Sequence, residues 1–330
     1  MLLNKFAEYL KSRSDNSFQV AIQNDMDEDR SLPSAEPVVA EQAEIVEGAG
    51  MSAHPIQQAK NTCFTHFLDG AQATRRIGFH NHTVPILYAH LGAVIRQRNA
   101  DRRMSTSYQA FSENLYFSFD RLDPSEMLKS GIEAKNVKVE GDGDAHPLML
   151  LELARRAASN DRAELERKLA DEWMKSSTDD EWLLWDGSIT GRIEAAKHPR
   201  VVGVIKSHQT QYFGVEDQRK ILSLGVGERS SVFQPRGRGW SPVYSWYLRL
   251  HSNVGRDIYF GLVRVEAAAS KNTIAIADEI SGWLMRERSP LALPDSRWDR
   301  MIYPIRDCEQ YIKSIAPSKT MIESALAGMT

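Results

Sequence analysis

The stretch EWLLWDGSITGRIEAAKHPRVVGVIKSH, residues 181–208, contains two apolar runs that predict neighbouring strands. The first run, residues 182–185, ends at Asp186-Gly187, and the second, residues 201–205, ends at Lys206. A carboxylate at the end of a buried strand, followed by glycine, is expected at the mouth of a sheet rather than in its core. That edge is where α/β proteins place their functional groups. We therefore expect Asp186 to lie in a functional site.

The same pattern occurs earlier, in CFTHFLDG at residues 63–70, where the predicted strand ends at Asp69-Gly70. If Asp69 and Asp186 meet, their carboxylates repel each other unless a cation lies between them. An oxygen-only site of this kind suits Mg²⁺ or Mn²⁺ better than zinc. Such sites typically serve phosphodiester hydrolysis, because the metal activates water and stabilises the leaving oxygen.

The order of predicted elements indicates the fold class. In the first half of the chain we expect strands at 63–69 and within 75–89, a short helix at 91–97, and a long helix over 148–173 with a break near 159–161. The two strands around Asp186 follow. After them we expect a strand pair at 243–250 and 258–266, and closing helices at 273–286 and 307–315. This is not the strict alternation of a doubly wound parallel sheet. It is the order of a ribonuclease H-like α/β fold, a mixed sheet flanked by helices, in which acids on the first and fourth strands meet and the intervening helix supplies a glutamate.

Three glutamates of the long helix are candidates for that third acid. Glu166 lies beside the apolar stripe that includes Leu169 and Trp173, so it can reach the sheet edge. Glu164 projects about 200° away around the helix and is the second choice, and Glu152 is the third. The alternative is that all three are solvated surface charges.

Two further residues could complete the site. Lys206 ends its strand beside Asp186, where an ammonium could bind a phosphate or orient water; the alternative is a surface lysine at a strand end. Asp307 begins the last predicted helix and could supply a fourth acid, although a helix N-cap is its simpler interpretation.

Other polar and aromatic residues indicate less. His80 and His82 would share one face of a strand, where histidines are more often packing or surface residues than ligands. Arg236 and Arg238 in PRGRG could hold a DNA backbone from a loop or belong to an ordinary turn. Tyr259 alternates with apolar neighbours and is expected to pack in a sheet rather than stack on bases. The chain has no GxxxxGK[ST] phosphate loop.

Size and composition set the frame. The 330 residues can bury a sizeable core, and a net charge of −3 argues against nucleic-acid binding through bulk charge alone. Two cysteines give neither a metal-ligand spacing nor a disulfide framework, and no apolar run approaches the roughly 20 residues that span a bilayer. We expect a cytoplasmic protein with no membrane association. Residues 1–58 are predicted to form a helix and an acidic linker, and residues 59–330 the folded domain.

The chain resembles the NurA family of DNA-end-processing nucleases. The resemblance rests on the segments that cover roughly residues 63–315: FLDG at 67–70, the helix at 162–173, LLWDGSI at 183–189, VVGVIKSH at 201–208, VRVE at 263–266 and WDRMIYPIRDCEQYI at 298–312. The chain departs from the family in having FLDGAQ in place of Asp-Gly-Ser at the first site, and in its long acidic N-terminal segment.

The resemblance implies a homodimeric, Mn²⁺- or Mg²⁺-dependent nuclease acting on DNA. It also implies a partnership with a HerA-type hexameric ATP-driven DNA translocase, in DNA end processing, repair or defence against foreign DNA. Asp69 and Asp186 match the family's two Asp-Gly metal ligands, Glu166 or less closely Glu164 its helical glutamate, and Lys206 its strand lysine. Asp307 stands near a late acidic or histidine residue of the family.

Two other functions stay open. The first is a non-catalytic DNA-binding or regulatory subunit of a translocase complex. The second is a phosphotransferase of the actin and hexokinase type, which shares the sheet order but needs adenosine-binding glycine loops that the sequence does not show.

Overall fold

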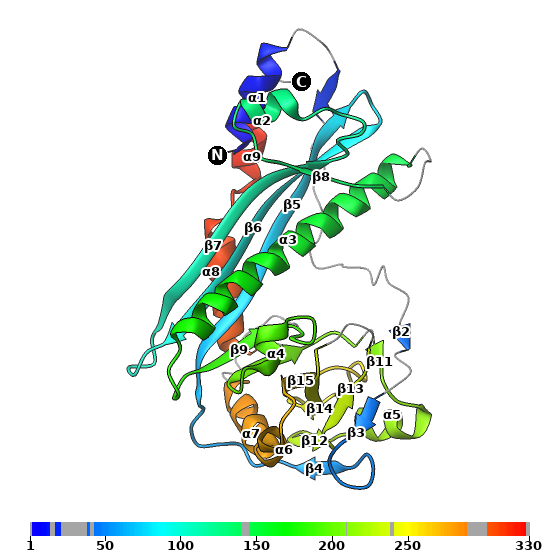
Figure 1. Cartoon of the computed structure of the whole chain (residues 1–330), viewed down its shortest axis with the longest axis vertical. Helices are drawn as coiled ribbons and strands as arrows, with labels where there is room; N and C mark the ends of the chain where they lie inside the picture. The colour runs from blue at the N-terminus through cyan, green and yellow to red at the C-terminus, as the bar shows by residue number, and fades with distance from the viewer. Residues whose placement is uncertain are drawn as a thin grey trace.

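A computed structural model describes residues 2–13, 17–20, 38–39, 43–139, 145–208, 210–237, 241–288 and 302–327 (Figure 1). The described helices are α1 (Leu2–Ser12), α2 (Ser125–Lys129), α3 (Pro147–Ser176), α4 (Ile193–Lys197), α5 (Val215–Leu222), α6 (Lys271–Ala275), α7 (Ala277–Glu287), α8 (Tyr303–Ile315) and α9 (Lys319–Leu326). The strands are β1 (Phe18–Val20), β2 (Val38–Val39), β3 (Ala43–Ile45), β4 (Ala53–Pro55), β5 (Phe64–His80), β6 (Val84–Arg98), β7 (Met104–Phe117), β8 (Ala134–Asn136), β9 (Trp182–Asp186), β10 (Val201–Ile205), β11 (Thr210–Gln211), β12 (Glu228–Ser230), β13 (Phe233–Pro235), β14 (Val243–Arg249) and β15 (Leu262–Ala268).

One large mixed sheet organises the molecule. Its centre has the order β7-β6-β5-β9-β10, followed by β15 and β14. Strands β5, β6 and β7 form an antiparallel meander, whereas β9 is parallel to β5 and β10 is parallel to β9. Strand β15 then returns antiparallel to β10. The long helix α3 follows β8 at the edge of the sheet and leads back across the meander to β9.

Two helices cover opposite faces of the central strands. Leu68 and Trp185 pack in one apolar cluster with Trp173 of α3. Phe67 and Leu184, the preceding residue on each strand, pack in a different cluster that includes residues of α8. Because successive side chains of a strand point to opposite faces, α3 and α8 lie on the two sides of the sheet. Figure 1 shows α3 running along the meander with α8 behind it.

The strand and helix predictions around the second Asp-Gly are confirmed, and several others are wrong. Residues 91–97 belong to β6 rather than to a helix. The prediction failed because both faces of this strand are largely buried, and a continuous apolar run shows no alternation that would distinguish a strand from a helix. Helix α3 continues through 159–161, where Asp161 accepts a hydrogen bond of 2.8 Å from the Tyr116 hydroxyl. Strand β5 does not end at Asp69 but continues to His80. His82 lies in the turn after β5, with φ of 60°, and does not share a strand face with His80.

The N-terminal region contributes to the same sheet. Helix α1 is confirmed, and its buried face packs with Ile322 and Leu326 of α9. Residues 43–55 were predicted to belong to an acidic linker, but β3 pairs with β13 and β4 pairs with β12. The other acidic residues of that prediction, within 21–37 and at Glu41, lie outside the described residues. None of the described helices is both long enough and apolar enough to cross a membrane.

Candidate functional site

The register of the parallel strands places the two predicted aspartates side by side. Leu68 of β5 pairs with Trp185 of β9, so Asp69 and Asp186 are the next residues on adjacent strands. Parallel pairing between β5 and β9 stops at this point, although β5 itself continues. After Asp186 the chain turns through Gly187, whose φ of 133° is a conformation that favours glycine. The acidic pair therefore forms where one strand ends beside another that continues.

Lys206 completes a three-residue cluster on the face covered by α8. Val204 of β10 pairs with Asp186, and Lys206 lies two residues farther along the same face. Its Nζ donates a hydrogen bond of 2.6 Å to Oδ2 of Asp186. The side chains of Lys206 and Asp186 are 21% and 20% exposed, so solvent reaches the pair. The sequence prediction that Lys206 lies beside Asp186 agrees with this contact.

The buried member of the cluster is Asp69, which is 6% exposed. Burial, and then the nearby charge of Asp186, raise the pKa of Asp69 well above its ordinary value, and Lys206 only partly opposes them. Burial also opposes the charge of Lys206, but Asp186 and Asp69 outweigh it and raise the Lys206 pKa. Asp69, Asp186 and Lys206, which we call the acid pair with its lysine, thus place two carboxyl groups beside one ammonium, and the ionised form of Asp69 is disfavoured.

Glu166 is held on the opposite face of the sheet. Gly70 follows Asp69 and therefore faces α3, and the Glu166 carboxylate lies against this glycine. Oε1 pairs with Arg162, and Oε2 accepts hydrogen bonds from Trp185 Nε1 at 3.2 Å and from Arg192 Nη2 at 3.3 Å. Glu166 is 2% exposed. Two guanidinium groups thus compensate this buried carboxylate in the structure.

The other two helical candidates lie elsewhere. Glu164 accepts two hydrogen bonds from Arg167, at 2.6 and 2.7 Å, on the partly exposed side of α3. Glu152 is exposed in the first half of the helix. Of the three glutamates, only Glu166 reaches the sheet.

Gly70 is expected to be sensitive to substitution. A Cβ at this position would lie 2.9 Å from Cγ of Glu166 and closer still to its Oε1. Because Arg162, Arg192 and Trp185 hold that carboxylate, Gly70→Ala is expected to lower the free energy of unfolding by about 1–3 kcal/mol, as overpacked sites do. Urea unfolding measures this. Gly191→Ala is the matched control, since nothing lies within 4 Å of its added Cβ; equal losses in both variants would refute the tight fit.

The acid of α8 that acts electrostatically on the acid pair with its lysine is Glu309 rather than Asp307. Asp307 accepts a 2.6 Å hydrogen bond from Arg96 Nε. Glu309, in contrast, acts electrostatically on both Asp69 and Lys206, and its Oε1 is 2.7 Å from Nζ of Lys313. Sequence reasoning missed Glu309. It lies four residues after the buried Ile305, on the side of α8 that packs on the sheet, and that spacing could have identified it.

Glu266 of β15 fixes the loop that follows Asp186. Its Oε2 accepts hydrogen bonds of 2.8 Å from both the Ser188 hydroxyl and the Ile189 backbone N–H. Its Oε1 accepts one of 2.9 Å from the Thr190 hydroxyl and pairs with Arg264. Glu266 is 1% exposed, so these contacts satisfy a buried charge. Three consecutive residues are thereby held in place directly after Gly187.

Replacing Glu266 is therefore expected to loosen the loop. Glu266→Gln removes the charge that faces buried Arg264, and breaking a buried ion pair in this way typically costs about 3–5 kcal/mol. Urea unfolding measures the loss. Glu228→Gln provides the control, because Glu228 accepts a hydrogen bond from Gly225 N in an exposed turn. An unchanged unfolding midpoint for Glu266→Gln would contradict the assigned role.

The donor set of the cluster fits a divalent cation in part. Asp69 and Asp186 provide adjacent carboxyl oxygens, the hard ligands that Mg²⁺ or Mn²⁺ prefers. Glu166 does not join them, since its carboxylate lies on the α3 side with its arginines. Within the described ranges, no group of three or more His, Cys, Asp and Glu side chains is placed to hold a metal ion. Two of the three predicted ligands are thus together.

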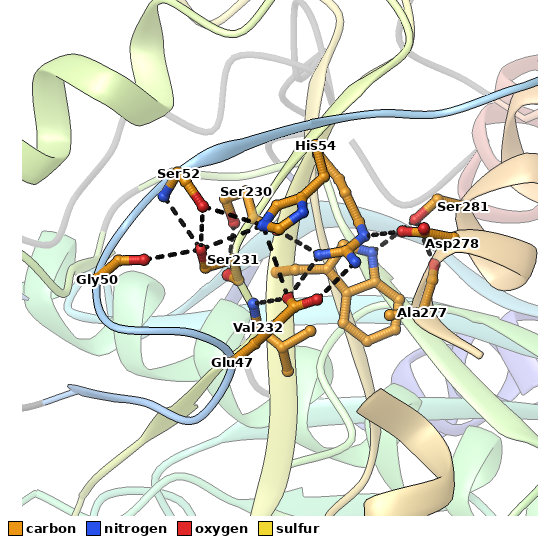
Figure 2. A network of polar contacts seen from close by, with 12 residues as sticks. Glu47, Gly50, Ser52, His54, Ser230, Ser231, Val232, Ala277, Asp278 and Ser281 are labelled. Carbon is orange, nitrogen blue, oxygen red and sulfur yellow. Dashed lines mark hydrogen bonds and ion pairs between the residues drawn. The ribbon is translucent and has the colours of Figure 1, made fainter. Parts of the chain in front are cut away.

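A second polar network resembles a hydrolase triad but lacks its geometry (Figure 2). His54 Nε2 lies 3.1 Å from Ser52 Oγ and 3.4 Å from Ser231 Oγ, and Glu47 Oε2 is 4.0 Å from the same nitrogen. In a triad the acid binds the other ring nitrogen. Glu47 instead accepts two hydrogen bonds from buried Arg229, at 2.7 and 2.8 Å. The network anchors the segment between β3 and β4 to the sheet.

Basic residues gather at a separate cleft. A cavity of about 670 Å³ near the start of β5 is lined in part by Lys60, Arg98, Arg102 and Arg286. Arg98 is bound by both carboxylate oxygens of Glu287, at 2.6 and 2.8 Å. None of Asp69, Asp186 and Lys206 lines this cleft.

Of the two arginines that could hold DNA or belong to an ordinary turn, Arg236 does not line this cleft. Arg236 pairs with Glu44 of β3 at the surface. Arg238 lies outside the described residues.

Comparisons with known proteins give structural likenesses alone. No protein-family profile matches the chain, and no curated protein matches it. Among solved structures, the chain is similar to the NurA nuclease from Sulfolobus solfataricus, with a TM-score of 0.45 and 11% identity over 84% of this chain and 85% of the other. The chemistry of the site is therefore derived from the residues of this chain.

Proposed function

We propose that the chain is a divalent-cation-dependent DNA nuclease whose reaction centre is the acid pair with its lysine. The observation that carries the proposal is the juxtaposition of Asp69 and Asp186 across two parallel strands, with Lys206 bonded to Asp186. Adjacent carboxylates disfavour each other's ionised form unless a cation lies between them. The motif resemblance to the NurA family points to the same chemistry.

Each residue of the cluster has a distinct role in this proposal. Asp69 and Asp186 would hold Mg²⁺ or Mn²⁺, which when bound polarises water and stabilises the leaving oxygen of a phosphodiester. Lys206 would exchange its contact with Asp186 for a phosphate oxygen, so that its charge faces the scissile group. Asp69 is the most buried of the three, and its position is rigid because β5 continues past it on both sides.

The sheet order supports the finer assignment to the ribonuclease H-like class. Three antiparallel strands, a helix, and two parallel strands place the first and fourth strands side by side, as the sequence predicted. We propose Glu166 as the helical acid of this class; to serve as a ligand it would have to exchange its arginine partners for the cation. Glu309 is the acid we propose from α8, and Asp307 would act at a distance through Arg96.

The partners follow as proposals from the same resemblance. A homodimer working with a HerA-type translocase would deliver DNA ends to the site in repair or defence. The alternative function is that of a DNA-binding or regulatory subunit. In that case the protein would have the same fold but would not cleave DNA.

Cleavage of linear DNA tests the proposal. Purified protein incubated with linear duplex and single-stranded DNA is expected to shorten it in the presence of Mn²⁺ or Mg²⁺ and to stop when EDTA is added. DNA binding with no cleavage under either cation, with and without a HerA-type partner, would favour the regulatory subunit and overturn the nuclease.

A further inference from the structure

We infer that the pocket beside Lys206 binds a nucleobase of a single-stranded DNA end and stacks it on Tyr259. The inference rests on the proposed nuclease function and adds to it the form of the substrate. The pocket encloses about 500 Å³, within the range of roughly 300–1,000 Å³ typical of small-molecule sites. Lys206, Ser207 and His208, which follow β10 directly, line it together with residues of β11, α5, β14 and the stretch 257–262. One wall therefore continues from the acid pair.

An aromatic platform forms the second wall. The rings of His208 and Tyr259 are stacked with centroids 5.1 Å apart and an interplanar angle of 18°, and buried Tyr247 packs 6.2 Å from His208. His208 Nε2 lies 2.9 Å from the carbonyl oxygen of Leu262, which fixes the plane of the imidazole. Tyr259 is 38% exposed, so part of its ring is open to solvent. The sequence prediction that Tyr259 packs within a sheet is wrong, because the residue lies in the turn before β15.

A polar side chain in the wall of this pocket carries a buried atom without a partner. Gln218 of α5 lines it, and its side-chain Oε1 is buried with no hydrogen bond among the described residues. Buried polar atoms normally have partners, and a ligand that drew the Gln218 amide toward the cavity would supply one. A nucleobase offers this edge and a flat face together.

The charge of the lining favours a base over a phosphate. Its lysine, Lys206, is already bonded to Asp186, and the lining also includes Asp257. Stacking on aromatic side chains is how proteins hold single-stranded DNA with little sequence preference. A base of a duplex cannot enter such a pocket without leaving its stack. A terminal base in the pocket would place its phosphate near Lys206 and hence near the acid pair.

The test uses fluorescence of 2-aminopurine, which is quenched when the base stacks. Short single-stranded DNA carrying this base at successive positions from one end is titrated, without divalent cation, into Asp186→Asn protein so that cleavage does not intervene. Quenching is expected at one position near the end of the DNA. When Tyr259→Phe is added to the Asp186→Asn protein, the quenching should be retained. When Tyr259→Ala is added instead, the quenching should be lost and the affinity for the DNA lowered about fivefold or more. Tyr303→Ala, which replaces an exposed tyrosine outside the pocket lining, controls for non-specific effects.

The outcomes separate this inference from the function on which it rests. Equal quenching with Tyr259→Ala, or none at any position, overturns the pocket assignment even if wild-type protein cleaves DNA. Position-specific quenching that depends on Tyr259 supports the pocket, and it does so whether or not wild-type protein cleaves DNA with Mn²⁺; absent cleavage would then count against the nuclease alone.

Discussion

Asp186→Asn is expected to lower Mn²⁺-dependent DNA cleavage by about 10³-fold or more, the scale on which loss of a group acting directly at the reacting centre is felt. The substitution keeps the side-chain shape but removes the charge that the cation requires, and it leaves Lys206 without its 2.6 Å carboxylate partner. Single-turnover cleavage of end-labelled linear DNA measures the effect.

The matched control for this variant is Asp217→Asn. Asp217 lies on α5 and makes a surface hydrogen bond of 2.9 Å with Lys220, so its charge is removed without touching the acid pair. Circular dichroism and the urea midpoint establish that both variants are folded. Cleavage by Asp186→Asn at the wild-type rate would place the reaction centre elsewhere in the chain.

Asp69→Asn is expected to separate activity from stability. Cleavage should fall as far as in Asp186→Asn, because the second cation ligand is lost. Stability without metal should rise, because burial and the charge of Asp186 both disfavour ionised Asp69. Thermal unfolding in EDTA is expected to show a midpoint a few degrees above wild type at neutral pH.

The sign of the pH dependence follows from the raised Asp69 pKa. The native protein keeps the Asp69 proton to higher pH than the unfolded chain, which releases it near the ordinary value of 3.8. The stability that this proton contributes is therefore present below that value and is lost as pH rises through the folded pKa. The advantage of Asp69→Asn should accordingly grow with pH over that window and then level off. A variant less stable than wild type at neutral pH in EDTA would show that the Asp69 charge is compensated in the fold.

The parts of the fold that the sequence predicts well are those with short, bounded apolar runs. Strands β9 and β10 match the predicted runs because polar residues bound each short apolar run, and β14 and β15 pair as a predicted antiparallel unit. The adjacency of Asp69 and Asp186 also agrees with the prediction, since parallel strands bring equivalent positions together. The continuation of β5 past Asp69 was not predicted, because its later residues have a mixed polarity that reflects partial burial on both faces.

Local sequence patterns do not determine which face of β5 the helical glutamate meets. The apolar stripe of the helix indicates that Glu166 faces a sheet. Asp69 and Gly70, however, lie on opposite faces of β5. Because Leu68 packs with α3, Gly70 faces that helix too, and Glu166 meets Gly70 rather than Asp69. Long-range contacts likewise brought β3 and β4 into the sheet. An acidic, proline-containing stretch offers no periodic pattern for such pairing.

Calorimetric titration with Mn²⁺ tests most directly whether the two aspartates form a cation site. Wild-type protein is expected to bind Mn²⁺ saturably and to lose that binding in the double variant D69N/D186N, while the Asp217→Asn control keeps it. Mn²⁺ binding of unchanged affinity in the folded double variant would contradict the account.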